Sequence, residues 1–390
     1  MFPNPLRRRK AIVTLFGVAA TFLVASCAAP TAGRGPSVNP DAAVPVALLL
    51  PGGSGNSGDE VIAQSLRQAA ELAMADLQGV RIDLRVYNTG PDPAGAAQAA
   101  TKAVDEGAKI ILGPVFAEAS NAAGIAVAAR GVNVLSFSNN TDIAGGNVFV
   151  LGPTFQNTAT RLAGFAARQG KGRIAVVQEK TPAGNLGARS IAAAARATGA
   201  QVVGTASYDF SQQGLIAAMP SIVSTVKGSG ANAVFLTADT DGALPLLTQL
   251  LPEAGIDPKV TTFIGLTRWD IPPATLSLPG VQGGWFALPD PGLTAQFQAR
   301  YAAAYGTPPH PIAGLAYDGI AAVGALVRTG NPNALSAAAL TQGSGFAGVN
   351  GIFRLRPDGT NERGLAVASI QNAQVVVIDP APRSFGGAGL

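Results

Sequence analysis

Short apolar runs alternate along this chain with longer segments of helical composition. The clearest example lies between Lys109 and Asn140, where the apolar runs 109–112 and 132–137 flank an alanine-rich segment. Runs this short, bounded by turn-forming residues, predict buried strands, and the segment between them, which ends before Gly131, predicts a helix. Strand, helix and strand in this spacing predict two parallel strands joined by a right-handed crossover.

The same alternation continues over most of the chain. It predicts further strands at 44–50, 81–87, 147–151, 173–178, 201–208, 233–237, 260–265, 281–288, 367–370 and 374–378. It predicts helices at 59–77, 92–106, 154–169, 183–197, 211–226, 241–251, 292–305 and 311–328. Because the series begins again after residue 153, we predict an α/β protein with two Rossmann-like lobes that have parallel-sheet cores.

Length and composition agree with this division. A chain of 390 residues accommodates two domains, and 47% hydrophobic with 13% charged residues suits buried parallel sheets. The first lobe is predicted to comprise 44–151 and about 289–344, and the second 152–288 and about 345–380. Residues 28–43, rich in Ala, Gly and Pro, are predicted to be a flexible tether, and 381–390 a loose tail.

The first 27 residues have the pattern of a lipoprotein signal peptide. A basic region at 7–10 precedes an apolar run at 11–24, which is short for a membrane span. The sequence Val-Ala-Ser-Cys that ends at Cys27 resembles the bacterial lipobox, whose cysteine is lipidated. An ordinary secretory signal with an incidental cysteine is the alternative. In lipoproteins the next residue directs sorting, and Ala28 points to the outer membrane rather than the inner one, with the protein facing the periplasm.

Charge argues against a nucleic-acid partner. Residues 1–26 carry four basic side chains and no acidic ones, so the rest of the chain has 23 basic and 23 acidic residues. A chain that is formally neutral after its signal segment gives no electrostatic support for binding nucleic acid.

Catalytic chemistry is scarce in this sequence. His310 is the only histidine and Cys27 the only cysteine, which excludes an internal disulfide and a zinc site built from these residue types. His310 stands between prolines before a predicted helix, where a surface or capping role is expected. No nucleophile-elbow or phosphate-loop motif stands in the required context. We therefore expect no enzyme activity, no catalytic residue, no metal and no cofactor.

The predicted carboxyl ends of two neighbouring strands carry small and polar residues. These segments are 113–120 and 136–141. In open α/β sheets, ligands bind in the crevice beyond the carboxyl ends of the strands. The pattern therefore predicts the functional site at this edge.

The order of several short motifs resembles the leucine-binding protein family, which has the type I periplasmic-binding fold. The motifs are VALLLPG at 46–52, ILGP at 111–114, VNVLSFS at 132–138, RIAVV at 173–177, YDG at 317–319, GFAGVNGIF at 345–353 and PDG at 357–359. The resemblance covers about 44–379. It implies two α/β lobes joined by three crossover segments, with a ligand clamped between them by hinge closure.

The resemblance also implies a set of ligand-binding residues. From the first lobe these are Phe116, Ala117, Glu118, Ser120, Ser138, Asn139 and Asn140, and from the second Asn185, Thr237, Asp239, Thr267 and Arg268. Two positions depart from the family pattern. Ala117 stands where amino-acid binders usually offer a hydroxyl, and Glu118, in the predicted first turn of a helix, would repel an incoming carboxylate.

Two functions fit these expectations. The first is a lipid-anchored solute receptor that delivers an amino acid or another small polar ligand to an ABC permease. The second is an outer-membrane lipoprotein that uses the same fold to bind and activate a peptidoglycan synthase, as penicillin-binding protein activators do. Ala28 and the altered pocket favour the second function, and the family resemblance favours the first.

Overall fold

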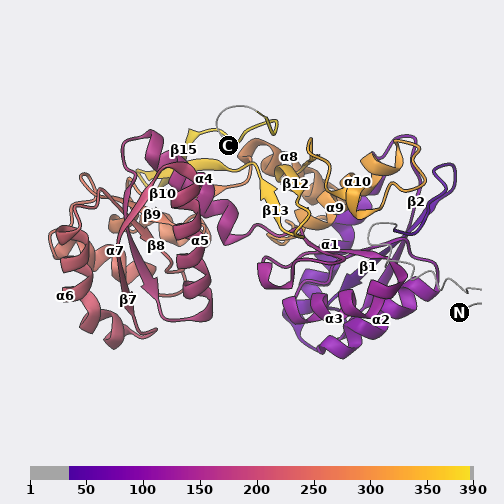
Figure 1. The fold of residues 1–390 in the computed structure, drawn as a ribbon, viewed down its shortest axis with the longest axis horizontal. Helices are drawn as coiled ribbons and strands as arrows, with labels where there is room; N and C mark the ends of the chain where they lie inside the picture. Colours follow the sequence, from indigo (N-terminus) through magenta and orange to yellow (C-terminus); the bar gives the residue numbers. More distant parts are fainter. Residues whose placement is uncertain (1–34, 387–390) are drawn as a thin grey trace, which may run out of the picture. The chain divides into compact units, whose positions relative to one another are not determined.

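The first lobe is built on a sheet of five parallel strands. The computed structural model describes residues 35–386, so Cys27 and the signal segment lie outside the described residues. The strand order is β2-β1-β3-β4-β5. Figure 1 labels β1 and β2 of this lobe together with α1, α2 and α3. The strands are β1 (Val44–Leu50), β2 (Ile82–Asn88), β3 (Ile110–Leu112), β4 (Asn133–Ser136) and β5 (Val148–Val150).

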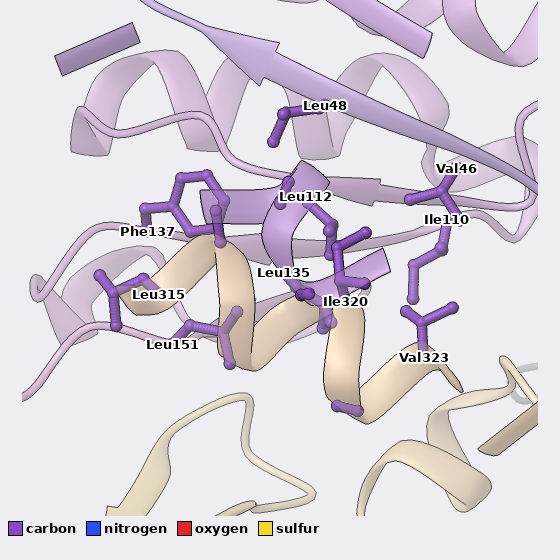
Figure 2. Packing of buried hydrophobic residues seen from close by; sticks show 14 of the residues in the cluster. Val46, Leu48, Ile110, Leu112, Leu135, Phe137, Leu151, Leu315, Ile320 and Val323 are labelled. Carbon is purple, nitrogen blue, oxygen red and sulfur yellow. The ribbon is translucent and has the colours of Figure 1, made fainter. Parts of the chain in front are cut away.

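Helices cover both faces of this sheet because its strands are apolar on both sides. Along β1, Val46, Leu48 and Leu50 enter one core and Ala47 and Leu49 the other, as the two-residue period of a strand requires. Helices α1 (Ser57–Asp76) and α9 (Gly314–Val327) pack on the first face, and α2 (Pro93–Asp105) and α3 (Ala117–Val127) on the second. Figure 2 shows Leu315, Ile320 and Val323 of α9 against residues of the strands.

The second lobe is built on a sheet of seven strands in the order β15-β14-β10-β9-β8-β6-β7. Its strands are β6 (Arg173–Glu179), β7 (Gln201–Tyr208), β8 (Ala233–Leu236), β9 (Thr262–Gly265), β10 (Trp285–Leu288), β14 (Ala366–Gln371) and β15 (Gln374–Asp379). Strands β6 to β10 are mutually parallel, β14 pairs antiparallel with β10, and β15 pairs antiparallel with β14.

Alanine and leucine side chains bind the helices of the second lobe to its sheet. Helices α4 (Phe155–Arg168) and α5 (Pro182–Thr198) share one core, and α6 (Gln212–Gly228) and α7 (Leu244–Glu253) share the other. The remaining helices are α8 (Pro291–Tyr305) and the short α10 (Ala337–Leu340). No helix within the described residues is long and apolar enough to cross a membrane.

A small antiparallel sheet precedes the last two strands of the large sheet. It consists of β11 (Phe346–Gly348), β12 (Gly351–Leu355) and β13 (Asn361–Arg363). Phe346, Phe353 and Leu355 pack in the first-lobe core with α9. Residues 345–380 were predicted to belong to the second lobe, but β11 lies against α9, so the small sheet packs with the first lobe instead.

The chain passes between the lobes three times, after β5, after β10 and after β13. The first and third passages are joined by hydrogen bonds: Asn361 Nδ2 donates to the carbonyl oxygens of Val150 and Gly152, each at 2.8 Å. Two α/β lobes with parallel-sheet cores and three crossover segments confirm the predicted fold class.

Both predicted loose ends are partly packed. Val38 is only 4% exposed, and its N–H donates to the Pro332 carbonyl at 2.9 Å. Near the other end, the guanidinium of Arg354 lies 4.6 Å from the centre of the Phe385 ring. The described parts of the predicted tether and tail, 35–43 and 381–386, are therefore attached to the folded body, which corrects the expectation that they hang free.

Candidate ligand-binding site

The loop after β3 places its four predicted site residues in different environments. Phe116 precedes the first residue of α3 and is 45% exposed, and Glu118 is exposed in the first helical turn. Ala117 begins the helix and is half-buried. Ser120 is fully buried, and its hydroxyl lies 2.7 Å from the Ser136 hydroxyl and donates to the Phe116 carbonyl at 2.9 Å. Ser120 therefore fastens α3 to β4 and is not presented to a ligand.

The loop after β4 is held by its own side chains. Ser138 is 6% exposed, and its hydroxyl accepts a hydrogen bond from the Asn140 N–H at 3.1 Å. The Asn140 side chain in turn accepts from the Asp142 N–H at 2.9 Å, which leaves its amide group for other partners. Asn139 is exposed. Asn139 and Asn140 are thus available to a ligand, whereas Ser138 supports the loop from below.

An outer cavity brings residues of both lobes together. It has a volume of about 530 Å³ and is lined by Asn139, Asn140, Asp142, Phe155, Pro182, Ala183, Asn185, Leu186 and Arg189. Three of the predicted site residues, Asn139, Asn140 and Asn185, line it. Asn185 lies in the first turn of α5, where its Oδ1 accepts a hydrogen bond from the Gln178 amide.

A smaller inner cavity adjoins the outer one, since Phe155 lines both. Its volume is about 250 Å³. It is lined by Pro153, Thr154, Phe155, Thr158, Leu266, Thr267, Arg268, Ile271, Ala287, Leu288, Pro289, Pro311, Ile312, Leu315, Asn350, Arg363 and Leu365. Two more predicted site residues, Thr267 and Arg268, are therefore brought to this cavity by the loop after β9.

Thr267 and Arg268 differ in how their polar groups are satisfied. The hydroxyl oxygen of Thr267 is buried and has no hydrogen-bond partner among the described residues. The guanidinium of Arg268 donates through Nε to Asp270 at 2.8 Å and through a terminal nitrogen to the other oxygen of the same carboxylate. A buried hydroxyl without a partner is costly unless something else binds it, so Thr267 marks a position for a ligand group.

Thr237 and Asp239, the remaining predicted site residues, line neither cavity. The Thr237 hydroxyl is buried and accepts from the Glu179 N–H at 3.1 Å, which joins β8 to β6. Asp239 is exposed and accepts from the Thr240 N–H at 2.7 Å. Both residues follow the carboxyl end of β8, as predicted, but neither side chain lines a cavity.

A buried ion pair lies behind the inner cavity, and the sequence analysis did not identify it as part of the site. Asp318 of α9 is fully buried and accepts from Arg363 Nη1 at 3.2 Å, from the Val349 N–H at 2.8 Å and from the Asn350 amide at 3.2 Å. Burial raises the pKa of Asp318, against the opposing effects of these donors. Arg363 also donates through Nε to the Leu151 carbonyl at 2.9 Å, so one side chain joins α9 to two crossover passages.

His310, the only histidine of the chain, makes a structural contact. The His310 N–H donates to the Ser65 hydroxyl at 2.8 Å, and burial lowers the pKa of its imidazole. This contact ties the start of α9 to α1. Among residues 35–386, no three His, Cys, Asp or Glu side chains are grouped as metal ligands would be.

Comparisons with known proteins agree with this architecture. A family model for periplasmic binding proteins matches residues 43–374. No match was found among curated proteins. Among solved structures, a branched-chain amino acid ABC transporter periplasmic ligand-binding protein from Burkholderia xenovorans LB400 has a TM-score of 0.69 at 18% identity, covering 88% of this chain and 97% of that one.

Two further solved structures carry a bound molecule. An ABC transporter substrate-binding protein from Desulfitobacterium hafniense in complex with Leu has a TM-score of 0.63 at 20% identity, covering 86% of this chain and 100% of that one. A solute-binding protein of an ABC transporter from R. palustris in complex with benzoate has a TM-score of 0.57 at 19% identity, covering 90% and 99%. At these identities the likeness shows the fold.

Proposed function

This chain belongs to the periplasmic binding protein family, and from that premise we propose that it is a solute receptor that binds a small organic molecule in the inner and outer cavities and delivers it to an ABC permease. The observation that carries the proposal is the convergence of residues from both lobes on two adjoining cavities that share Phe155. Concave sites of this size, lined by apolar groups with a few polar ones, are typical of ligand pockets.

Family membership places the protein in the periplasm or cell envelope. The matched structures are described as solute-binding proteins of ABC transporters, which favours solute binding over activation of a peptidoglycan synthase. The molecules in two of them, leucine and benzoate, define a sensible first panel of ligands. We propose that closure of the lobes around the three crossover passages buries the ligand.

We expect a cognate ligand to stabilise the protein and to make it more compact. At a free ligand concentration of 100 times Kd, the free energy of unfolding should rise by about 2.7 kcal/mol. Thermal denaturation across a panel of amino acids and small aromatic acids measures the first effect, and small-angle X-ray scattering at saturation the second. A protein that no panel member stabilises, and that captures a peptidoglycan synthase, would contradict transport.

Two phenylalanines supply a matched pair of variants for the same experiment. Phe155→Ala should weaken binding at least tenfold, since Phe155 lines both cavities. Phe210→Ala should leave binding unchanged, because Phe210 is 62% exposed and lines neither cavity. Equal effects of the two substitutions would place the ligand elsewhere.

We further propose that Cys27 carries a lipid anchor in one of the two membranes of the cell envelope. The basis is the succession of basic, apolar and lipobox residues that ends at Cys27. Since Val38 is already packed on the folded body, residues 28–37 alone connect it to the membrane, and they reach at most about 35 Å when fully extended. The ligand-binding lobes are therefore expected to stay close to the membrane that holds the anchor.

Replacement of Cys27 by serine tests the anchor. The variant should lose the lipid mass and move from the detergent fraction to the aqueous fraction in Triton X-114 partition. Density-gradient separation of the two membranes then assigns the wild-type protein to one of them. Unchanged partition of Cys27→Ser would show that the cysteine is not the site of attachment.

A further inference from the structure

The inner cavity is lined mostly by apolar residues, with a smaller number of polar ones. Its apolar lining includes Leu266, Ile271, Leu288, Ile312, Leu315 and Leu365. These side chains come from the loop after β9, from the end of β10, from the start of α9 and the turn before it, and from the third crossover passage. A ligand that fills this space must present a compact hydrocarbon body, because binding is favourable when the apolar surfaces of ligand and cavity are both removed from water.

The polar groups that remain available in the inner cavity favour an anionic ligand group. Arg268 uses Nε and one terminal nitrogen for Asp270, so Nη1 remains to donate to a ligand. The Thr267 hydroxyl is buried and unpartnered beside it. The first turn of α4, which contributes Phe155 and Thr158 to the lining, adds the positive end of a helix dipole.

No carboxylate lines the inner cavity within the part of the chain that the structure describes. Two acids that contact lining residues are already paired: Asp270 with Arg268, and Asp318 with Arg363. The only acidic residue that lines the outer cavity is Asp142. An ammonium group taken into the inner cavity would lose its hydration without gaining a partner, which is strongly unfavourable.

The volume limits the size of the hydrocarbon body. A cavity of about 150 Å³ in another protein accommodates benzene. The inner cavity, at about 250 Å³, has room for a body of that size and one carboxylate group. It is smaller than the roughly 300–1,000 Å³ of typical drug-sized sites.

We infer that the ligand is a small apolar monocarboxylate without an ammonium group, bound with its carboxylate at Thr267 and Arg268 and its hydrocarbon body among the leucines and isoleucines of the inner cavity. This inference rests on the proposed solute-receptor function and specifies its ligand class. Discrimination against amino acids comes from the absence of an acidic partner at this position.

Matched ligand pairs test the inference by titration calorimetry with the unmutated protein. 4-Methylpentanoate and leucine differ by one ammonium group, as do 3-phenylpropanoate and phenylalanine, and benzoate provides a smaller aromatic acid. We expect at least one of the three acids to bind, and each acid that binds to do so at least tenfold more tightly than its amino-acid counterpart. Tighter binding of leucine or phenylalanine would overturn the ligand class and leave the receptor function intact. Binding of none of the five would overturn the ligand class, and the wider panel described above would then decide on the receptor function.

Substitutions at the polar end locate the carboxylate. Arg268→Gln should weaken binding of the acid at least tenfold, and Thr267→Val about threefold or more. Arg67→Gln, the same chemical change on an exposed arginine of α1, should have no effect. Circular dichroism checks that each variant is folded, and Arg268→Lys, which keeps the charge, should recover part of the affinity. Wild-type affinity in folded Arg268→Gln would place the carboxylate elsewhere and overturn the assignment. So would leucine binding that depends on Asp142.

Discussion

Replacement of Asp318 by alanine is expected to lower the free energy of unfolding by about 3–5 kcal/mol, because it leaves the buried guanidinium of Arg363 without its counter-ion. Both side chains are nearly or fully buried, at 0% and 6% exposure. Asp318 also accepts hydrogen bonds from Val349 and Asn350, so three donors lose their acceptor at once. The effect should therefore exceed that of any exposed ion pair in the protein.

Urea denaturation measures this loss. Far-UV circular dichroism follows both lobes, and tryptophan fluorescence follows the second, where Trp269 and Trp285 lie. Arg130→Ala is the control, since its pair with Asp105 spans 2.8 Å but both side chains are more than half exposed. It should cost less than about 1 kcal/mol. If Asp318→Ala lowers the free energy of unfolding no more than this control does, the buried pair stabilises the crossover passages no more than an exposed pair would.

Replacement of Gly113 by alanine should also destabilise the protein strongly, by about 2–5 kcal/mol. Gly113 has a φ of +83°, in the left-handed region that residues with a Cβ disfavour. An added Cβ would stand 2.3 Å from the Leu49 carbonyl oxygen and 3.3 Å from the Phe137 ring. Because the first of these atoms belongs to the backbone of β1, the clash is relieved only by displacing the sheet or the loop after β3.

Gly107→Ala separates the two causes. Gly107 has a φ of +99°, and an added Cβ would meet no atom within 4 Å. This control should cost only the left-handed penalty, about 1–2 kcal/mol. Urea denaturation of the two variants side by side gives the difference. Equal losses would mean that the sheet accommodates the added methyl group at Gly113 without strain.

The strands and helices could be predicted closely because their signals are local. β7 has the predicted bounds, Gln201–Tyr208, and most of the other elements begin or end within about two residues of prediction. The short elements α10, β11, β12 and β13 were not predicted, and the other differences arise at turns. β10 begins at Trp285, four residues later than predicted, because 279–281 form a short 3-10 helix and Gly283 has a positive φ. α7 likewise begins three residues late, after a turn in which the Asp239 carbonyl accepts from Gly242 and Leu244.

The site could be predicted only to the level of its loops. The carboxyl ends of strands identify which segments approach a ligand, and five of the twelve predicted ligand residues, Asn139, Asn140, Asn185, Thr267 and Arg268, line the two cavities. Within a loop, however, the direction of a side chain depends on a rotation of one or two residues. Ser120 and Ser138 therefore lie inside, bonded to their own backbone or to Ser136, although they stand beside exposed neighbours in the sequence.

Apolar periodicity and the positions of glycine and proline determined the α/β class and the two lobes, since each is a property of neighbouring residues. The expectation of a binding protein came from the resemblance of short motifs to a known family. Tertiary structure alone decided the rest. Asp318 and Arg363 stand 45 positions apart and form a pair only when α9 meets the third crossover passage. The inner cavity takes its lining from six separated segments, and the packing of 35–43 and 381–386 depends on partners far away in the chain. Such long-range contacts leave no mark in the local pattern, because any segment of suitable composition could have supplied the partner.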